Sequence, residues 1–204
     1  MSALEIADIV GIICFALSGF LISVHYKLDI LGVFISSFLT ALGGGMIRDV
    51  LADRTPYVFT TNLPVILVVV TVVIALLFKL HKIADLEGKT VFIISDAVGL
   101  VSFSITGSIV AIQNDFNFLG VLILAFLTAV GGGTIRDILI NRVPSILVSE
   151  FYATVALIVA SIIFVLELLH LRSLPTLTLV FIFGVVLRIL AYYKKWHLPT
   201  LSKE

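Results

Sequence analysis

The sequence predicts an all-α membrane protein with seven transmembrane helices, arranged as two inverted three-helix repeats plus a seventh helix. Three observations lead to this prediction. The 204 residues are 60% hydrophobic and only 13% charged, with a mean hydropathy of +1.23, whereas soluble domains average about 45–50% apolar and about 25% charged residues. Apolar stretches of membrane-spanning length cover nearly the whole chain. The first half of the sequence also recurs in the second half.

The composition excludes several classes of protein. A soluble enzyme, a nucleic-acid binder and a disordered protein are excluded, because a soluble chain this apolar would lack the polar residues to cover its surface. Thirteen basic and thirteen acidic residues cancel, so no net charge attracts polyanions. The single cysteine, Cys14, has no partner for a disulfide or a metal site, and the four histidines show no metal-ligand spacing. We therefore expect no enzyme activity, no cofactor and no metal.

The helices are predicted from length and hydropathy, since a helix crossing the hydrocarbon core needs about 20 mostly apolar residues. Seven stretches qualify, at residues 7–24, 30–49, 62–80, 91–112, 116–137, 144–169 and 174–193. The joints between them are short, and only 79–89 is a longer charged loop. No soluble domain fits in the remainder, so residues 1–204 are expected to form one membrane domain.

The distribution of Lys and Arg predicts the orientation of the chain. One side of the predicted bundle carries three basic residues: Arg48, Arg54 and Arg172. The other side carries ten: Lys27, Lys79, Lys82, Lys89, Arg136, Arg142, Arg188, Lys194, Lys195 and Lys203. Because cytoplasmic loops carry the excess of basic residues, the N-terminus is expected outside and the C-terminus in the cytoplasm.

The two halves match at a constant offset of 88 residues. Between 31–56 and 119–144, 17 of 26 positions are identical. In the first helix of each half, Asp8, Gly11, Phe15 and Gly19 correspond to Asp96, Gly99, Phe103 and Gly107. Repeat one covers residues 5–87 and repeat two 93–172, and the seventh helix at 174–193 lies outside both. Each repeat has three spans, so the second enters from the opposite side of the membrane, an arrangement common in transporters.

A glycine triplet lies within the second helix of each repeat, at Gly43, Gly44 and Gly45 and at Gly131, Gly132 and Gly133. Gly costs about 1 kcal/mol against Ala in a helix interior, so the helix is expected to bend or unwind there beside a permeation path. Hydroxyls of Thr40 and Thr128 lie one turn earlier. The alternative is close helix packing through small residues, to which Gly11, Gly19, Gly99 and Gly107 are also suited.

Charged residues follow each triplet as the pairs Arg48-Asp49 and Arg136-Asp137. One interpretation is a charge cluster at each mouth of a pore. The other is an interfacial charge pair that ends the helix. Adjacent helical residues do not face each other, so each Arg is expected to pair across the two-fold axis or with Asp8 and Asp96. Such intramembrane carboxylates usually face an interior path.

These motifs resemble a known family. A duplicated T-A-[LV]-G-G-G-x-I-R-D segment, preceded by an F-x-x-[ST]-G helix, is similar to the trimeric intracellular cation (TRIC) channels, whose prokaryotic members are also labelled "glycine transporter" domains. The resemblance covers essentially the whole chain. It implies a homotrimer in a prokaryotic plasma membrane, with lipid contacts between protomers.

In each protomer the resemblance implies a pore for potassium and sodium, lined by the second and fifth helices, kinked at the triplets. The pore-lining set then comprises the two triplets with Thr40, Thr128, Phe15, Phe103, Ser18 and Thr106. The charge gates are Arg48, Asp49, Arg136, Asp137, Asp8 and Asp96. The alternative function is a secondary transporter of a small solute such as glycine, because inverted repeats suit both a channel and a carrier.

Overall fold

The structure, a computed structural model, describes residues 2–80, 90–148 and 151–196, which form nine α-helices and no strand. The helices are α1 (Ala3–His25), α2 (Ile30–Leu51), α3 (Tyr57–Thr60), α4 (Leu63–Leu77), α5 (Thr90–Gln113), α6 (Phe118–Leu139), α7 (Ser145–Val148), α8 (Tyr152–Leu168) and α9 (Leu174–Tyr193). Within these residues, α1, α2, α5, α6 and α9 are long and apolar enough to cross a membrane. The remaining apolar helices, α4 and α8, have 15 and 17 residues.

Two predicted spans differ from the helices found. The stretch 144–169 was expected to be one helix, but its first residues form the short α7, and α8 begins only at Tyr152. Phe151 immediately before it has φ 49°, a left-handed conformation that an α-helix does not continue through. The stretch 62–80 forms α4 only to Leu77, and the four-residue α3 precedes it. A hydropathy window averages over such short breaks.

The helix starts are set by the same local signals in both repeats. Asp29 and Asn117 lie 88 residues apart, and their side chains accept hydrogen bonds from the backbone of Gly32 and Gly120, at 2.7 and 2.9 Å. These N-caps satisfy donors that the first helical turn leaves unpaired. The duplicated sequence therefore gives α2 and α6 matching entries.

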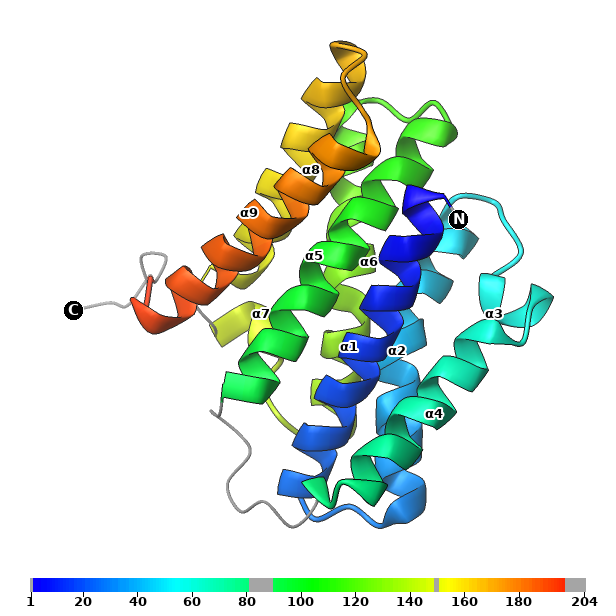
Figure 1. The fold of residues 1–204 in the computed structure, drawn as a ribbon, viewed down its shortest axis with the longest axis vertical. Helices are drawn as coiled ribbons and strands as arrows, with labels where there is room; N and C mark the ends of the chain where they lie inside the picture. Colours follow the sequence, from blue (N-terminus) through cyan, green and yellow to red (C-terminus); the bar gives the residue numbers. More distant parts are fainter. Residues whose placement is uncertain (1, 81–89, 149–150, 197–204) are drawn as a thin grey trace.

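The helices form a bundle with α1 and α5 side by side at its centre (Figure 1). They run in opposite directions, since α1 descends from the N-terminus in this view while α5 ascends. Helices α2 and α6 pack against them and against each other; α4 covers α1 and α2, and α8 covers α5 and α6. The helix outside the repeats, α9, packs on α5 and α8.

The crossing of α1 and α5 is built from a reciprocal pair of contacts between phenylalanine and glycine. The Phe15 ring lies where a Cβ on Gly99 would be, and the Phe103 ring lies 3.0 Å from the position of a Cβ on Gly11. The two rings are 5.3 Å apart and tilted by 58°. Both are buried, so these expected pore-lining residues lie in the core between the two central helices.

The glycine triplets lie at the crossing of α2 and α6, and both helices are continuous through them. The expected unwinding was therefore wrong. A Cβ on Gly44 would overlap the carbonyl oxygen of Thr128, and one on Gly132 would overlap that of Thr40. Glycine is required because the two backbones approach too closely for any side chain. This reciprocal contact, offset by four residues in each direction, also shows that the helices cross antiparallel.

Small residues also join the helices within each repeat. A Cβ on Gly19 would meet Ser37 and Thr40 of α2, and one on Gly107 would meet Ala125 and Thr128 of α6. The Thr40 and Thr128 hydroxyls donate back to their own helices, to the carbonyls of Ser36 and Leu124, both at 2.6 Å. The four glycines of α1 and α5 thus pack within one protomer.

We predict that Gly132→Ala destabilises the protein, whereas Gly45→Ala does not. The added methyl at 132 overlaps the Thr40 carbonyl, and overpacking of this kind costs about 1–3 kcal/mol. Nothing lies within 4 Å of a Cβ at 45, so the control is expected to be neutral or to gain up to about 1 kcal/mol of helix propensity. Thermal unfolding of the detergent-solubilised protein measures both. Equal midpoints for the two variants would contradict the assigned crossing.

Candidate functional site

Two buried charge clusters lie toward opposite ends of the bundle. The Arg48 cluster consists of Asp8 from α1 and Arg48 and Asp49 from α2. Its guanidinium donates from Nη1 to Asp8 Oδ1 at 2.7 Å and from Nε to Asp49 Oδ1 at 2.8 Å. Asp8 lies near the start of α1, and Arg48 and Asp49 lie near the end of α2, so the cluster lies toward the end of the bundle that holds the N-terminus.

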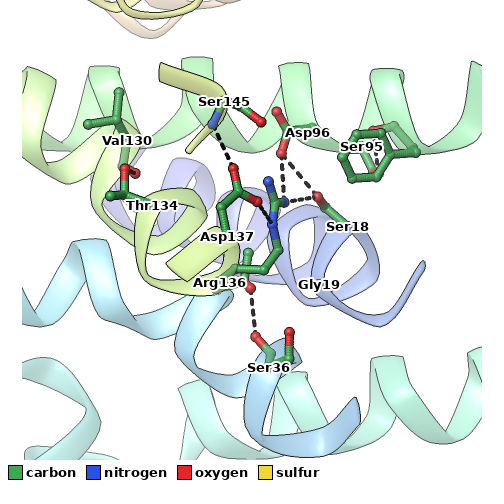
Figure 2. Close-up of polar contacts among 12 residues, drawn as sticks. Ser18, Gly19, Ser36, Ser95, Asp96, Val130, Thr134, Arg136, Asp137 and Ser145 are labelled. Carbon is green, nitrogen blue, oxygen red and sulfur yellow. Dashed lines mark hydrogen bonds and ion pairs between the residues drawn. The ribbon is translucent and has the colours of Figure 1, made fainter. Parts of the chain in front are cut away.

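The Arg136 cluster consists of Asp96 from α5 and Arg136 and Asp137 from α6 (Figure 2). Arg136 donates from Nη1 to Asp96 Oδ1 at 3.0 Å and from Nε to Asp137 Oδ1 at 2.9 Å. Ser18 of α1 joins the cluster: its hydroxyl accepts from Arg136 Nη1 at 2.7 Å and donates to Asp96 Oδ1 at 3.0 Å. A residue of repeat one thus completes the cluster of repeat two.

Each bond of the ion pairs has its counterpart 88 residues further on. The second carboxylate oxygens show the same match, since Asp49 Oδ2 accepts from the Tyr57 backbone at 2.9 Å and Asp137 Oδ2 from the Ser145 backbone at 2.7 Å. These bonds fix the first residues of α3 and α7. Thr106, the counterpart of Ser18, lies close to Asp8, while its hydroxyl donates to the Phe103 carbonyl at 3.3 Å.

These contacts settle the expected partners of the arginines. Pairing with Asp8 and Asp96 is confirmed, and each pair lies within one repeat. The expectation that an Arg would not contact the Asp next to it was wrong. The spacing rule concerns the direction in which side chains leave the helix, whereas the long arginine side chain folds back far enough for Nε to reach its neighbour's carboxylate.

Pairing makes the burial of these charges tolerable. Arg48 and Arg136 are 4% and 0% exposed, and an unpaired guanidinium at membrane depth is costly. Each cluster holds two carboxylates and one guanidinium, so both have a formal net charge of −1. Buried clusters with surplus negative charge favour cations over anions at both ends of the bundle.

The surroundings of the two clusters differ. The Arg48 cluster lines a cavity of about 690 Å³ together with Glu5, Arg54 and Tyr57. A further void of about 20 Å³ lies between this cluster, Gly45 and Phe103. At the other end, the Phe92 ring lies 5.5 Å from the Arg136 guanidinium, and Tyr152 is also buried beside it.

The expected site residues are therefore divided between two environments. Ser18 hydrogen-bonds within the Arg136 cluster, and Thr106 lies close to Asp8 of the Arg48 cluster. Phe15, Phe103, Thr40 and Thr128 lie in the helix crossings with the glycine triplets. Tyr152 was not anticipated, because its counterpart in repeat one is Pro64 and the comparison of repeats does not highlight it. In the described part of the chain, no three His, Cys, Asp or Glu residues are grouped to hold a metal ion.

Comparison with known proteins identifies the family. A family model described as "Glycine transporter" matches residues 5–81 and 93–167, the two repeats. The UPF0126 membrane protein YvgT of Bacillus subtilis is 34% identical over 200 residues, covering 98% of this chain and 97% of the relative. The chain belongs to this family. The inner membrane protein YadS of Escherichia coli is 38% identical over 151 residues, covering 74% of this chain and 72% of YadS.

Solved structures connect the family to TRIC channels. A structure reporting the basis for conductance through TRIC cation channels aligns with TM-score 0.84 and 35% identity, over 98% of each chain. A prokaryotic TRIC channel crystallised in 0.5 M KCl aligns with TM-score 0.84 and 33% identity, over 96% of this chain and 98% of the other. The TRIC orthologue from Rhodobacter sphaeroides, at 26% identity, aligns with TM-score 0.87 over 96% of this chain and the whole of the other. The expected resemblance is confirmed, and the similarity supports a cation channel rather than an enzyme.

We predict that Asp96→Asn destabilises the protein by about 3–5 kcal/mol, the usual cost of breaking a buried ion pair from one side. Asp29→Asn is the matched control, because Asp29 is exposed and Asn serves equally well as an N-cap. Thermal unfolding in detergent gives the comparison. If Asp96→Asn and Asp29→Asn have the same unfolding midpoint, the pairing of Arg136 with Asp96 does not stabilise the fold.

Proposed function

We propose that the chain forms a homotrimeric channel for potassium and sodium in the plasma membrane of a prokaryote. The observation that carries this proposal is the pair of matching clusters, each with one negative charge in excess, toward opposite ends of one bundle. A path that begins and ends at such clusters admits monovalent cations and repels anions. The similarity to TRIC cation channels supports the same function.

The proposed path runs inside each protomer, between α1, α2, α5 and α6, which supply both clusters. In this proposal α4, α8 and α9 also cross the membrane, giving seven spans and an inverted repeat. The opposite directions of α1 and α5 and the antiparallel crossing of α2 and α6 support this arrangement. The N-terminus and the Arg48 cluster then face outward, while the Arg136 cluster and the C-terminus face the cytoplasm.

The helix crossings lie between the clusters in this proposal. Ser18 and Thr106 extend each cluster inward, and Thr40, Thr128 and the glycine triplets follow. Phe15 and Phe103 form an apolar constriction, a feature that gates channels by excluding water. The void beside Phe103 and the Arg48 cluster supports this order along the path.

A carrier of a small solute such as glycine is the second candidate. The description of the matching family model favours it, as does the large cavity at the Arg48 cluster, because a carrier exposes its site to one side at a time. A channel instead needs a continuous water path with weak sites.

Recording from the purified protein in planar bilayers separates the two candidates. A channel is expected to show discrete current steps in potassium chloride. Detergent-corrected mass measurement of the same sample is expected to show three chains. Saturable solute uptake into vesicles, without current steps, would refute the channel and support the carrier.

We predict opposite changes in rectification for Arg48→Gln and Arg136→Gln in symmetric potassium chloride. Each substitution takes the local charge from −1 to −2, which favours cation entry from its own side, because charge effects are screened within about 8 Å at physiological ionic strength. Arg48→Gln should increase inward current and Arg136→Gln outward current. Arg172→Gln, which removes a charge paired with Glu167 instead, is the control. A shift in the same direction for both cluster variants would contradict the two-mouth arrangement.

A further inference from the structure

The end of α9 covers the start of α8 through side chains spaced four residues apart. Arg188, Tyr192 and Trp196 follow one another along the chain at this interval, which places Arg188 and Tyr192 on one face of α9. The Arg188 guanidinium lies 4.8 Å from the Tyr152 ring centroid and 6.0 Å from that of Tyr192. The centroids of the Trp196 and Phe151 rings are 5.9 Å apart, and the two ring planes are inclined by 74°. The helix outside the repeats thus holds the first residues of α8.

Tyr152 in turn covers the Arg136 cluster. A Cβ on Gly133 would lie 3.3 Å from Tyr152 Oη and 3.7 Å from Arg136 Nη2, so the two groups converge above this glycine. Both atoms are buried and lack a hydrogen-bond partner among the described residues. Buried polar atoms without partners are costly, and access of water to this point would satisfy both. The Tyr152 side chain is therefore suited to move away from Arg136 when water enters.

The other end of the protein shows what the cluster looks like without such a cover. Pro64 occupies the position equivalent to Tyr152, and it has no aromatic ring to place over Arg48. The Arg48 cluster opens into the cavity of about 690 Å³, of which Asp8, Arg48 and Asp49 form part of the wall. The matched clusters therefore differ at this position: Tyr152 lies beside Arg136, whereas the equivalent position of repeat one holds a proline.

We propose that Tyr152 closes the Arg136 end of the path and that Arg188 holds it closed through the cation–π contact. This proposal rests on the proposed channel function. Phe151, with φ 49°, holds the start of α8 in a conformation that its side chain disfavours. When Arg188 leaves the ring, the start of α8 is released and water reaches Arg136. We call this arrangement the latch: Arg188 of α9 holds Tyr152, the first residue of α8, over the Arg136 cluster.

The open fraction of single channels in symmetric potassium chloride tests the latch. Arg188→Gln removes the cation, and Tyr152→Leu removes the ring. Each is expected to lower the ratio of closed to open time about 2- to 30-fold, the range for a cation–π contact. Tyr152→Phe keeps the ring and removes the unpaired hydroxyl, so its open fraction is expected to equal or fall below that of the wild type. Arg188→Lys keeps the positive charge and is expected to be intermediate.

Arg172→Gln is the matched control, because Arg172 immediately precedes the other end of α9 and pairs with Glu167; it should leave the open fraction unchanged. Wild-type open fractions in conducting Arg188→Gln and Tyr152→Leu trimers would overturn the latch while leaving the channel standing. An equal rise for Tyr152→Phe and Tyr152→Leu would overturn the cation–π contact. If Arg188→Gln does not assemble, Tyr152→Leu decides. Absence of current steps in the wild type would refute the proposed function itself.

Discussion

A guanidinium buried inside an apolar bundle must be paired, and this constraint determines much of the structure. Arg48 and Arg136 each need carboxylates within hydrogen-bonding distance, and those carboxylates come from the preceding long helix and from the adjacent residue. Pairing each arginine with the carboxylate of the preceding helix brings α1 against α2 and α5 against α6. The remaining carboxylate oxygens then hold the backbone at the start of α3 and α7. One ionic requirement therefore positions three elements in each half: α1, α2 and α3 in the first, and α5, α6 and α7 in the second.

Close packing at glycine is the second constraint on the structure. The backbones of α2 and α6 approach until a single methyl group would collide, and the two Phe–Gly contacts between α1 and α5 lock the central pair. The triplets therefore place two charged clusters on one rigid scaffold rather than opening the helix. Antiparallel crossing of duplicated helices puts those clusters at opposite ends. A single duplicated motif thereby creates two similar mouths.

Much of this was predictable from the sequence, for identifiable reasons. The offset of 88 predicted matching helices. Pairing with Asp8 and Asp96 was one of the two arrangements expected for the arginines, because buried charges require counter-charges. The continuous triplets were not predicted, since glycine spacing alone does not distinguish unwinding from a close crossing. Contact between Arg48 and Asp49 depends on how a flexible side chain folds back. Tyr152 was not predicted, because its counterpart in the first repeat is Pro64 and a comparison between repeats identifies only residues that both repeats share.

In the proposed channel, surplus negative charge at both clusters selects cations over anions. The most direct measurement is the reversal potential of the wild-type protein in a potassium chloride gradient across a planar bilayer. If the clusters select cations, the reversal potential lies close to the Nernst potential of potassium. Its sign relative to the dilute side is then the same whichever face of the protein the dilute solution bathes. A reversal potential near zero, or one displaced toward chloride, would contradict cation selection.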